Sequence, residues 1–316
     1  MKIIWILAAL LAILVILTLT VSLICFFRIF FSPKRKIDPD SFDIPVGEIY
    51  EPYRESMVGW MKMTRTLPHR DIEIKSHDGL TLRGKYYEHQ PGAPIEILMH
   101  GYRGSAERDM SGGVSRCHTL GRSALVINHR ASGTSDGSVI TFGRLERLDC
   151  LAWIKYIIDH IDRDAKIILT GISMGAATVM LTAAEEDLPP NVVGVLADCG
   201  YSSAEEIIKK VMREMKLPAN LLYPFARLGG LLFGHFDVSK ASPINAMKRA
   251  RVPVLFIHGD SDAFVPHAMS VENFKACVTK KELVTVAGAG HGLCFPVNPE
   301  QYFEALKNFF DPLLGK

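Results

Sequence analysis

The sequence predicts an α/β fold built on a mostly parallel sheet, preceded by a membrane-spanning helix. Two observations predict the sheet: short apolar runs of strand length recur from residue 95 onward, and segments with helical spacing separate them. A third observation, the absence of any charged residue between positions 3 and 27, predicts the spanning helix. The chain of 316 residues is long enough for one large domain with an appendage.

Composition excludes two classes of protein. Hydrophobic residues make up 48% of the chain, which is too many for a disordered protein. The 36 Lys and Arg residues are balanced by 34 Asp and Glu residues, so a strongly basic nucleic-acid-binding protein is not expected. No internal repeat or low-complexity tract indicates a solenoid or a propeller.

The apolar segment near the N-terminus predicts a transmembrane anchor over residues 1–31. At about 1.5 Å per residue, this stretch covers the roughly 30 Å hydrocarbon core of a bilayer. A cleaved signal peptide is the alternative, but its apolar region is shorter and ends in small residues. Here the segment ends in the bulky Cys25-Phe26-Phe27-Arg28, which favours the anchor.

Basic residues on the two sides of the segment indicate its orientation. Lys2 precedes it, whereas Arg28, Lys34, Arg35 and Lys36 follow it closely. By the positive-inside rule, the bulk of the chain is expected in the cytoplasm. The five cysteines beyond the segment, an odd number at unrelated spacings, give no disulfide framework and favour the same side.

Residues 32–66 are expected to connect the anchor to the main domain, which we assign to residues 67–316. The first part, residues 32–45, is charged and broken by prolines, which is typical of a linker. Residues 46–66 carry Tyr50, Tyr53, Met57 and Trp60 at helical spacing, which predicts one amphipathic helix. Its expected role is packing on the domain, with contact to the membrane surface as the alternative.

The main domain is expected to begin with a hairpin. Residues 71–75 and 80–87 alternate between polar and apolar side chains, and the turn signal His77-Asp78-Gly79 separates them. Six buried strands are then predicted, at 95–99, 124–127, 167–169, 192–196, 252–257 and 283–286. Helices are predicted at 145–161, 174–186, 268–278 and 300–310. Strands alternating with helices imply a sheet covered on both faces, with the antiparallel hairpin at its leading edge.

The interval from 202 to 247 does not fit this alternation. It contains a helical segment at 203–215 and apolar residues from 221 to 233. We interpret it as an inserted helical lid. Because ligands bind at the carboxyl ends of strands in open α/β sheets, this insertion is expected to roof the site.

The pentapeptide Gly171-Ile172-Ser173-Met174-Gly175 lies between a predicted strand and a predicted helix. The two glycines permit a sharp turn that would lift the Ser173 hydroxyl clear of the sheet. The alternative is an ordinary turn in which the serine caps a helix. The strand–turn–helix context favours a nucleophile.

A serine nucleophile needs a base and an acid that orients the base. His291 follows the last predicted strand and lies among small residues in Gly290-His291-Gly292, which leave its imidazole room to approach Ser173. The preceding strand is followed by two candidate acids, Asp260 and Asp262. Both remain open on the residues alone.

Attack on a carbonyl also requires backbone donors for the developing oxyanion. The loop His100-Gly101-Tyr102-Arg103-Gly104 follows the strand at 95–99 and would supply the N–H of Tyr102, with the N–H of Met174 as the second donor. His100 is expected to brace this loop. Arg103 is expected to be solvated, with pairing to an anionic substrate as the alternative.

These motifs give residues 67–316 a resemblance to the α/β-hydrolase superfamily, within which the chain is similar to bacterial N-terminally anchored hydrolases of the serine-aminopeptidase-like and monoacylglycerol-lipase-like type. The resemblance implies an α/β-hydrolase fold with Ser173, Asp262 and His291 as a catalytic triad in the family's chain order. It favours Asp262 because the family pattern places the acid before x-x-Val-Pro. Asn128 departs from the family's usual Asp, and Ala131 from its usual Gly, which affects local loop contacts.

Together these features predict a membrane-anchored serine hydrolase that cleaves carboxylic esters, with acyl or lipid-like substrates. No cofactor and no metal are expected, and the oligomeric state is left open. One alternative is an aminopeptidase in which Glu205 and Glu206 bind a substrate α-ammonium, although an acidic first helical turn explains them more simply. A second alternative is a non-catalytic binding module at the membrane.

Overall fold

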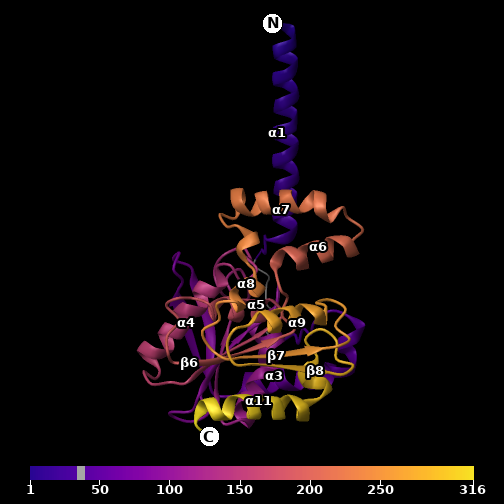
Figure 1. Cartoon of the computed structure of the whole chain (residues 1–316). Helices are drawn as coiled ribbons and strands as arrows, with labels where there is room; N and C mark the ends of the chain where they lie inside the picture. Colours follow the sequence, from indigo (N-terminus) through magenta and orange to yellow (C-terminus); the bar gives the residue numbers. More distant parts are fainter. Residues whose placement is uncertain (34–39) are drawn as a thin grey trace.

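A single eight-stranded sheet organises the chain from residue 70 onward in the computed structural model, which describes residues 1–33 and 40–316 (Figure 1). The strand order is β1-β2-β4-β3-β5-β6-β7-β8. The strands are β1 Arg70–Lys75, β2 Thr81–Tyr87, β3 Ile95–Met99, β4 Ser123–Ile127, β5 Ile167–Ile172, β6 Val192–Asp198, β7 Val254–Gly259 and β8 Lys281–Val286. β1 and β2 form an antiparallel hairpin, β2 is antiparallel to β4, and the other pairings are parallel. The predicted mostly parallel sheet with a leading hairpin is confirmed.

The burial of each strand follows from its side-chain pattern. All five positions of β3 and of β4 are buried, as expected of central strands covered on both faces. β1 alternates, with Ile72 and Ile74 buried between exposed polar residues. In the sheet centre Ile97 pairs with Leu125 on one side and Leu169 on the other. This register places one apolar layer against each group of covering helices.

Helices cover both faces of the sheet. One apolar cluster joins strands to α4, α5, α8 and α9, and Trp153 of α4 is fully buried in it. On the other face, two clusters join the strands to α3 and α11. The covering helices are α3 Ala106–Thr119, α4 Glu146–His160, α5 Met174–Thr182, α8 Pro243–Met247, α9 His267–Ala276 and α11 Pro299–Leu314, and the short α10 Cys294–Val297 precedes α11.

α3 was not among the predicted helices. Gly112 and Gly113 lie in its middle and weaken the helical signal in the sequence. The structure shows why Gly112 is there: a Cβ at this position would lie 2.7 Å from the Trp60 ring. The glycine lets the preceding segment pack closely on α3.

The single helix predicted at 46–66 is wrong in its first part. The structure has a 3-10 helix, η1 Glu48–Tyr53, followed by α2 Arg54–Thr66. Pro52 explains the break because it lacks an N–H and disfavours α geometry at the residue before it. α2 packs on α3, with Met61 buried and the hydroxyls of Thr64 and Ser111 3.2 Å apart. Packing on the domain is therefore the role that the structure shows.

The N-terminal helix α1 Lys2–Ile29 projects away from the rest of the molecule (Figure 1). Within the described part of the chain it is the one helix long and apolar enough to cross a membrane. Its last turns are built into the domain: Phe30 is fully buried, Ile140 N donates to Phe30 O at 2.8 Å, and Ser32 N donates to Ser138 O at 2.8 Å. Lys34, Arg35 and Lys36, three of the basic residues that indicate the orientation of the helix in the membrane, lie outside the described residues.

The inserted segment, residues 202–247, forms α6 Ala204–Glu214, α7 Ala219–Phe233, η2 Val238–Lys240 and α8. α7 lies across α1 near the point where α1 reaches the domain (Figure 1). The two helices approach closely because of Gly229, where a Cβ would lie 2.4 Å from Ser22 O. The Phe26 and Phe233 rings, 5.8 Å apart, continue this contact.

Candidate active site

Ser173 lies in a strained turn between β5 and α5. Its φ of 57° and ψ of −115° are unusual for a residue with a side chain. A Cβ at Gly171 would lie 2.2 Å from Gly175 C and O, and one at Gly175 would lie 2.1 Å from Met99 O. Both positions therefore require glycine. The turn places Ser173 at the start of α5, at the carboxyl end of β5.

The structure brings Ser173, His291 and Asp262 together from three loops at the same edge of the sheet. His291 Nε2 lies 2.9 Å from Ser173 Oγ, and His291 Nδ1 lies 2.7 Å from Asp262 Oδ2. With Nδ1 donating to the carboxylate, Nε2 is free to accept the serine proton. Asp260 lies outside this chain of bonds and instead accepts from Gly288 N at 2.8 Å.

Four donors hold the Asp262 carboxylate in place. Oδ1 accepts from Phe264 N at 2.9 Å and Val265 N at 2.8 Å, while Oδ2 accepts from His291 and, at 3.1 Å, from His258 Nε2. Burial raises the pKa of Asp262, but the hydrogen bonds from His258 and His291 outweigh it and bring the pKa well below its usual range. Asp262 thus stays ionised.

His258 is a supporting residue that the sequence did not single out. It is fully buried near the end of β7, and its Nδ1 lies 2.6 Å from Ser270 Oγ. Since Nε2 donates to Asp262, Nδ1 accepts from the Ser270 hydroxyl. The signal available in the sequence was only its place four residues before Asp262.

The loop after β3 carries Tyr102, one of the two expected oxyanion donors, and it lies against Ser173. A Cβ at Gly101 would lie 3.5 Å from Ser173 Cβ. His100 is buried and spans the loop: its Nδ1 donates to Gly101 O at 2.8 Å and its Nε2 accepts from His129 N at 3.1 Å. The bracing role predicted for His100 is confirmed. Met174, the second expected donor, is the first residue of α5 and carries one of the unpaired N–H groups typical of a helix start.

The partly exposed Arg103 side chain bonds the end of the N-terminal helix. Its Nη2 donates to the carbonyl oxygens of Arg28 and Phe31 at 3.0 Å each, and Tyr102 Oη donates to Ile29 O at 2.7 Å. These carbonyl bonds were not expected from the sequence, and pairing of Arg103 with an anionic substrate stays an untested alternative. Carbonyl groups at the end of a helix lack partners within that helix, and these two side chains supply them.

A cavity of about 560 Å³ opens beside the serine and histidine. Its walls include Ser173, Tyr102 and His291, and residues of η1 and α2 close one side. The apolar side chains that share this cavity are Val46, Ile49, Met57, Trp60, Phe264 and Phe295. Its size suits a small organic ligand.

No residue of the inserted segment lines this cavity, among those that the structure describes. The expectation that the segment roofs the site is wrong for this cavity. α7 packs on α1, and α6 contacts the acid loop, where Lys210 Nζ donates to Ala263 O at 2.6 Å and lies 5.4 Å from the centre of the Phe264 ring. Glu205 pairs with Lys209, and Ser203 caps the helix by accepting from Glu206 N. The helical-turn interpretation of the two glutamates therefore fits the structure.

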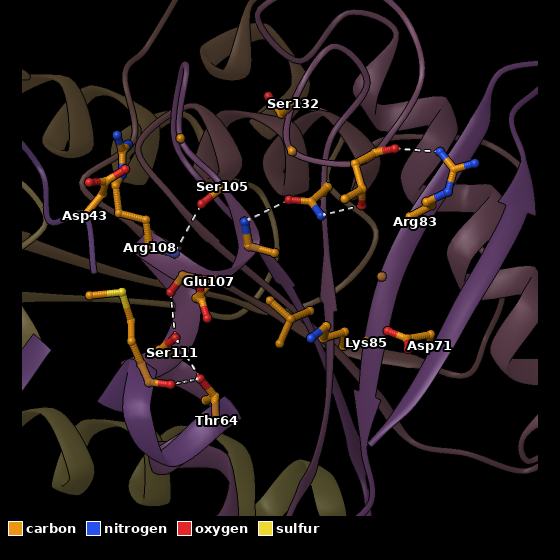
Figure 2. Close-up of a pocket in the computed structure, with 18 of the residues that line it drawn as sticks. Asp43, Thr64, Asp71, Arg83, Lys85, Ser105, Glu107, Arg108, Ser111 and Ser132 are labelled. Carbon is orange, nitrogen blue, oxygen red and sulfur yellow. Dashed lines mark hydrogen bonds between the residues drawn. The ribbon is translucent and has the colours of Figure 1, made fainter. Parts of the chain in front are cut away.

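A second cavity, of about 780 Å³, lies between the hairpin, α2 and the start of α3 (Figure 2). It contains none of Ser173, Asp262 and His291. Near it the Asn128 side chain accepts from Ala106 N at 3.0 Å and donates to Thr134 Oγ1 at 3.4 Å. Asn128, which departs from the family pattern, thus uses both its amide oxygen and its amide nitrogen in hydrogen bonds to neighbouring loops.

Two groups of side chains have metal-type donors close together. Cys199 joins Asp262 and His291 in the first, and His77 joins Asp78 and Asp149 in the second. In the first group the carboxylate and imidazole already bond each other. In the second, the Arg130 guanidinium donates to both carboxylates. Neither arrangement is open for a cation without breaking these bonds.

The chain is similar to several known proteins. The chain is 26% identical over 193 residues to the uncharacterized protein YqkD of Bacillus subtilis, a match that spans 61% of this chain and 63% of YqkD, less than two thirds of that relative. It is 28% identical over 226 residues to the protein Rv2307c of Mycobacterium tuberculosis, which covers 70% and 72% of the two chains. The Schizosaccharomyces pombe protein bem46 is 24% identical over 217 residues, 67% of this chain and 66% of bem46.

Solved structures show the same fold. The Pyrococcus furiosus esterase Pf2001 aligns with a TM-score of 0.66 at 21% identity, over 90% of this chain and 98% of the esterase. Est1E from Butyrivibrio proteoclasticus, solved with ferulic acid bound, aligns with a TM-score of 0.58 at 23% identity, over 78% of this chain and all of Est1E (100%). The family model described as "Alpha/beta hydrolase family" matches residues 97–305, from β3 into α11. Because that match covers well over half of the sequence, the chain belongs to the alpha/beta hydrolase family.

Proposed function

We propose that this protein is a serine hydrolase that cleaves carboxylic esters through an acyl-enzyme. The observation that carries the proposal is the continuous chain of hydrogen bonds from Ser173 Oγ through both nitrogens of His291 to Asp262. A serine hydroxyl alone is a poor nucleophile, and this arrangement provides a base and an ionised group that orients it. The strained turn at Ser173 supports the same role.

In the proposed reaction, His291 Nε2 takes the hydroxyl proton as Ser173 Oγ attacks the ester carbonyl. The N–H groups of Tyr102 and Met174 stabilise the negative charge on the carbonyl oxygen. The tetrahedral intermediate collapses when His291 returns the proton to the leaving alcohol. A water molecule then repeats the sequence on the acyl-enzyme and releases the acid, so the scheme needs no cofactor.

We propose acyl or lipid-like esters as the substrate class. Support comes from the apolar side chains around the cavity, including Ile49, Trp60 and Phe264, and from the apolar helix α1. Most of the exposed wall of this pocket is apolar, which suits an acyl chain. The charged residues that also line it are Glu48, Arg108, Asp109, Arg116 and Asp198. Glu205, one of the two residues that would bind the α-ammonium of an aminopeptidase substrate, is paired with Lys209.

We propose that α1 anchors the protein in a membrane, with the hydrolase domain on the cytoplasmic side. Its 28 residues extend about 42 Å at 1.5 Å per residue, enough to span a bilayer. Arg28 and the basic residues at 34–36 support this orientation. Burial of Phe26 and Phe30 in the domain argues against removal of the segment as a signal peptide, because cleavage after it would take core side chains away.

The test is hydrolysis of p-nitrophenyl esters from acetyl to palmitoyl by the full chain in detergent micelles. The expected result is an optimum at medium or long acyl chains, together with covalent labelling by a fluorophosphonate probe. Ser173→Ala is the control and should lose both labelling and turnover. Labelling without turnover of any ester would exclude esters as substrates, and absence of labelling would favour a non-catalytic binding module.

Replacement of Ile49 by alanine tests which segment contacts the acyl chain. Ile49 lines the cavity beside the serine, whereas Leu221 of the inserted segment does not. Loss of one or two methylene contacts should lower kcat/KM for long-chain esters by about fivefold and leave acetyl esters unchanged. Leu221→Ala, the matched control, should not alter the chain-length profile in micelles. The opposite pattern would show that the inserted segment binds the acyl chain.

A further inference from the structure

The outward face of α7 carries an apolar stripe with several exposed side chains. Leu221 is 63% exposed, Leu231 43% and Leu232 44%. Spacings of three and four residues place the stripe on one side of the helix. Its exposed members are Leu221, Pro224, Leu231 and Leu232, and the partly buried Phe225 and Leu228 lie between them. A stripe of this kind on a water-exposed helix marks an interaction surface.

The opposite face of α7 is the one that packs on the protein. Ala226, Gly229 and Gly230 are buried there. The one charged residue of the helix, Arg227, lies at the boundary between the two faces and is paired with Asp237 through two hydrogen bonds of 2.9 and 2.8 Å. The outward stripe therefore contains no charge. An uncharged apolar face of this kind can lie against acyl chains while the opposite face packs on the protein.

The contact between α7 and α1 fixes the depth of the stripe. Gly229 packs against the backbone of Ser22. The segment of α1 from Ile3 to Ser22 has about 20 residues and rises about 30 Å, the thickness of a hydrocarbon core. α7 thus crosses α1 where the hydrocarbon core would end, and α1 continues away from the domain on the far side of α7 (Figure 1).

The end of α1 is not a flexible tether. Tyr102 and Arg103 cap its last carbonyl groups, and Phe30 contacts the rings of Phe142 at 5.9 Å and Phe236 at 5.1 Å. The bond from Ile140 N to Phe30 O ties the following residues to the domain as well. The domain therefore keeps one orientation relative to α1, and the stripe stays at a fixed depth along the axis of α1.

We propose that α7 lies in the lipid–water interface of the membrane that holds α1, with its apolar stripe against the acyl chains. The proposal rests on the anchoring role of α1. It makes the membrane contact a two-part surface, one spanning helix and one in-plane helix that cross at Ser22 and Gly229. The hydrolase domain is then held against the bilayer and does not swing beneath it.

Fluorescence quenching in vesicles tests this placement. The full chain is reconstituted in phosphatidylcholine and phosphatidylglycerol vesicles whose acyl chains carry bromine. Leu231→Trp and Leu221→Trp, each in a Trp5→Phe background, place one probe near each end of α7. Both positions are exposed, so the larger ring needs no core rearrangement. Each added tryptophan should lose about half of its emission, because an interfacial helix buries its apolar face about 5–10 Å deep.

Two controls separate the possible failures. Val278→Trp is at an exposed apolar position on the connection between α9 and β8, and its emission should be unchanged by brominated lipid. The emission of Trp5, measured as the difference between the wild type and Trp5→Phe, reports insertion of α1. Loss of Trp5 quenching would overturn the anchor. Quenching of Trp5 without quenching at 221 or at 231 would overturn the interfacial helix. The same result is expected if a second copy of the chain covers α7 and keeps lipid away from these two positions.

Discussion

Asp262→Asn is expected to lower kcat for ester hydrolysis by about 10⁴-fold, the size of loss typical when the orienting acid of a triad becomes an amide. Oδ1 of Asp262 accepts from Phe264 N and Val265 N, so the amide oxygen of asparagine would remain there. The NH₂ group would then face His291 Nδ1 and force the imidazole proton onto Nε2. In that tautomer His291 cannot accept the proton of Ser173.

Asp260→Asn is the matched control, two residues away in the same loop. Asp260 accepts from Gly288 N and from Ser261 Oγ, and an asparagine oxygen can accept both bonds. Its kcat should stay within about twofold of the wild type, as for most surface substitutions. Steady-state kinetics on one p-nitrophenyl ester, with thermal unfolding to verify the fold, measures both variants. A large loss for Asp260→Asn and a small one for Asp262→Asn would reverse the assignment.

Much of this site could be predicted because its signals are local in sequence. The glycines at 171 and 175 and the small residues around His291 mark sharp turns after buried apolar strands. Parallel strands end at the same edge of a sheet, so loops far apart in the chain are expected to meet. Spacing alone does not show which of the two candidate acids, Asp260 or Asp262, orients His291. The structure shows it, because only Asp262 is hydrogen-bonded to His291.

The wall of the cavity was not predictable in the same way. The helical pattern at 46–66 indicated an apolar face, but no local pattern states which surface that face meets. Ile49 reaches Gly290, where a Cβ would lie 3.3 Å from Ile49 Cδ1, across 241 positions of the chain. The inserted segment had the stronger apolar signal, yet it packs on α1. Nothing in either segment alone distinguishes a helix that covers the sheet edge from one that covers another helix.

The end of α1 gave the largest difference between expectation and structure. An uninterrupted apolar segment predicts a spanning helix, and hydropathy does not distinguish lipid-facing residues from residues that face a protein. Phe30 and Phe27 look alike in the sequence. In the structure Phe30 is fully buried, while Phe27 is 49% exposed. Their difference is set by contacts with Phe142 and with Phe236 of the inserted segment, more than one hundred and some two hundred residues later in the chain.

Phe30→Ala should therefore destabilise the domain although the residue belongs to the apolar N-terminal segment. The ring contacts those of Phe26, Phe142 and Phe236 at 6.4, 5.9 and 5.1 Å. Removing a fully buried phenylalanine ring lowers the free energy of unfolding by about 3–5 kcal/mol, because burial is lost and a cavity remains. In a domain of this size the midpoint of thermal unfolding should fall by about 10 °C. Calorimetry of the full chain in nanodiscs measures it.

Phe27→Ala is the control, since it removes the same ring from the same helix. Phe27 contacts only Phe26 and Phe31 among aromatic rings of the described residues and is half exposed, so its loss should change the free energy of unfolding by about 0.5 kcal/mol or less. Equal and small effects for both variants would mean that the helix end only tethers the domain. A large effect confined to Phe30 would instead make the last turns of α1 part of the hydrolase core, and because Tyr102 bonds the adjacent Ile29 carbonyl, the same variant should also disturb the loop beside Ser173.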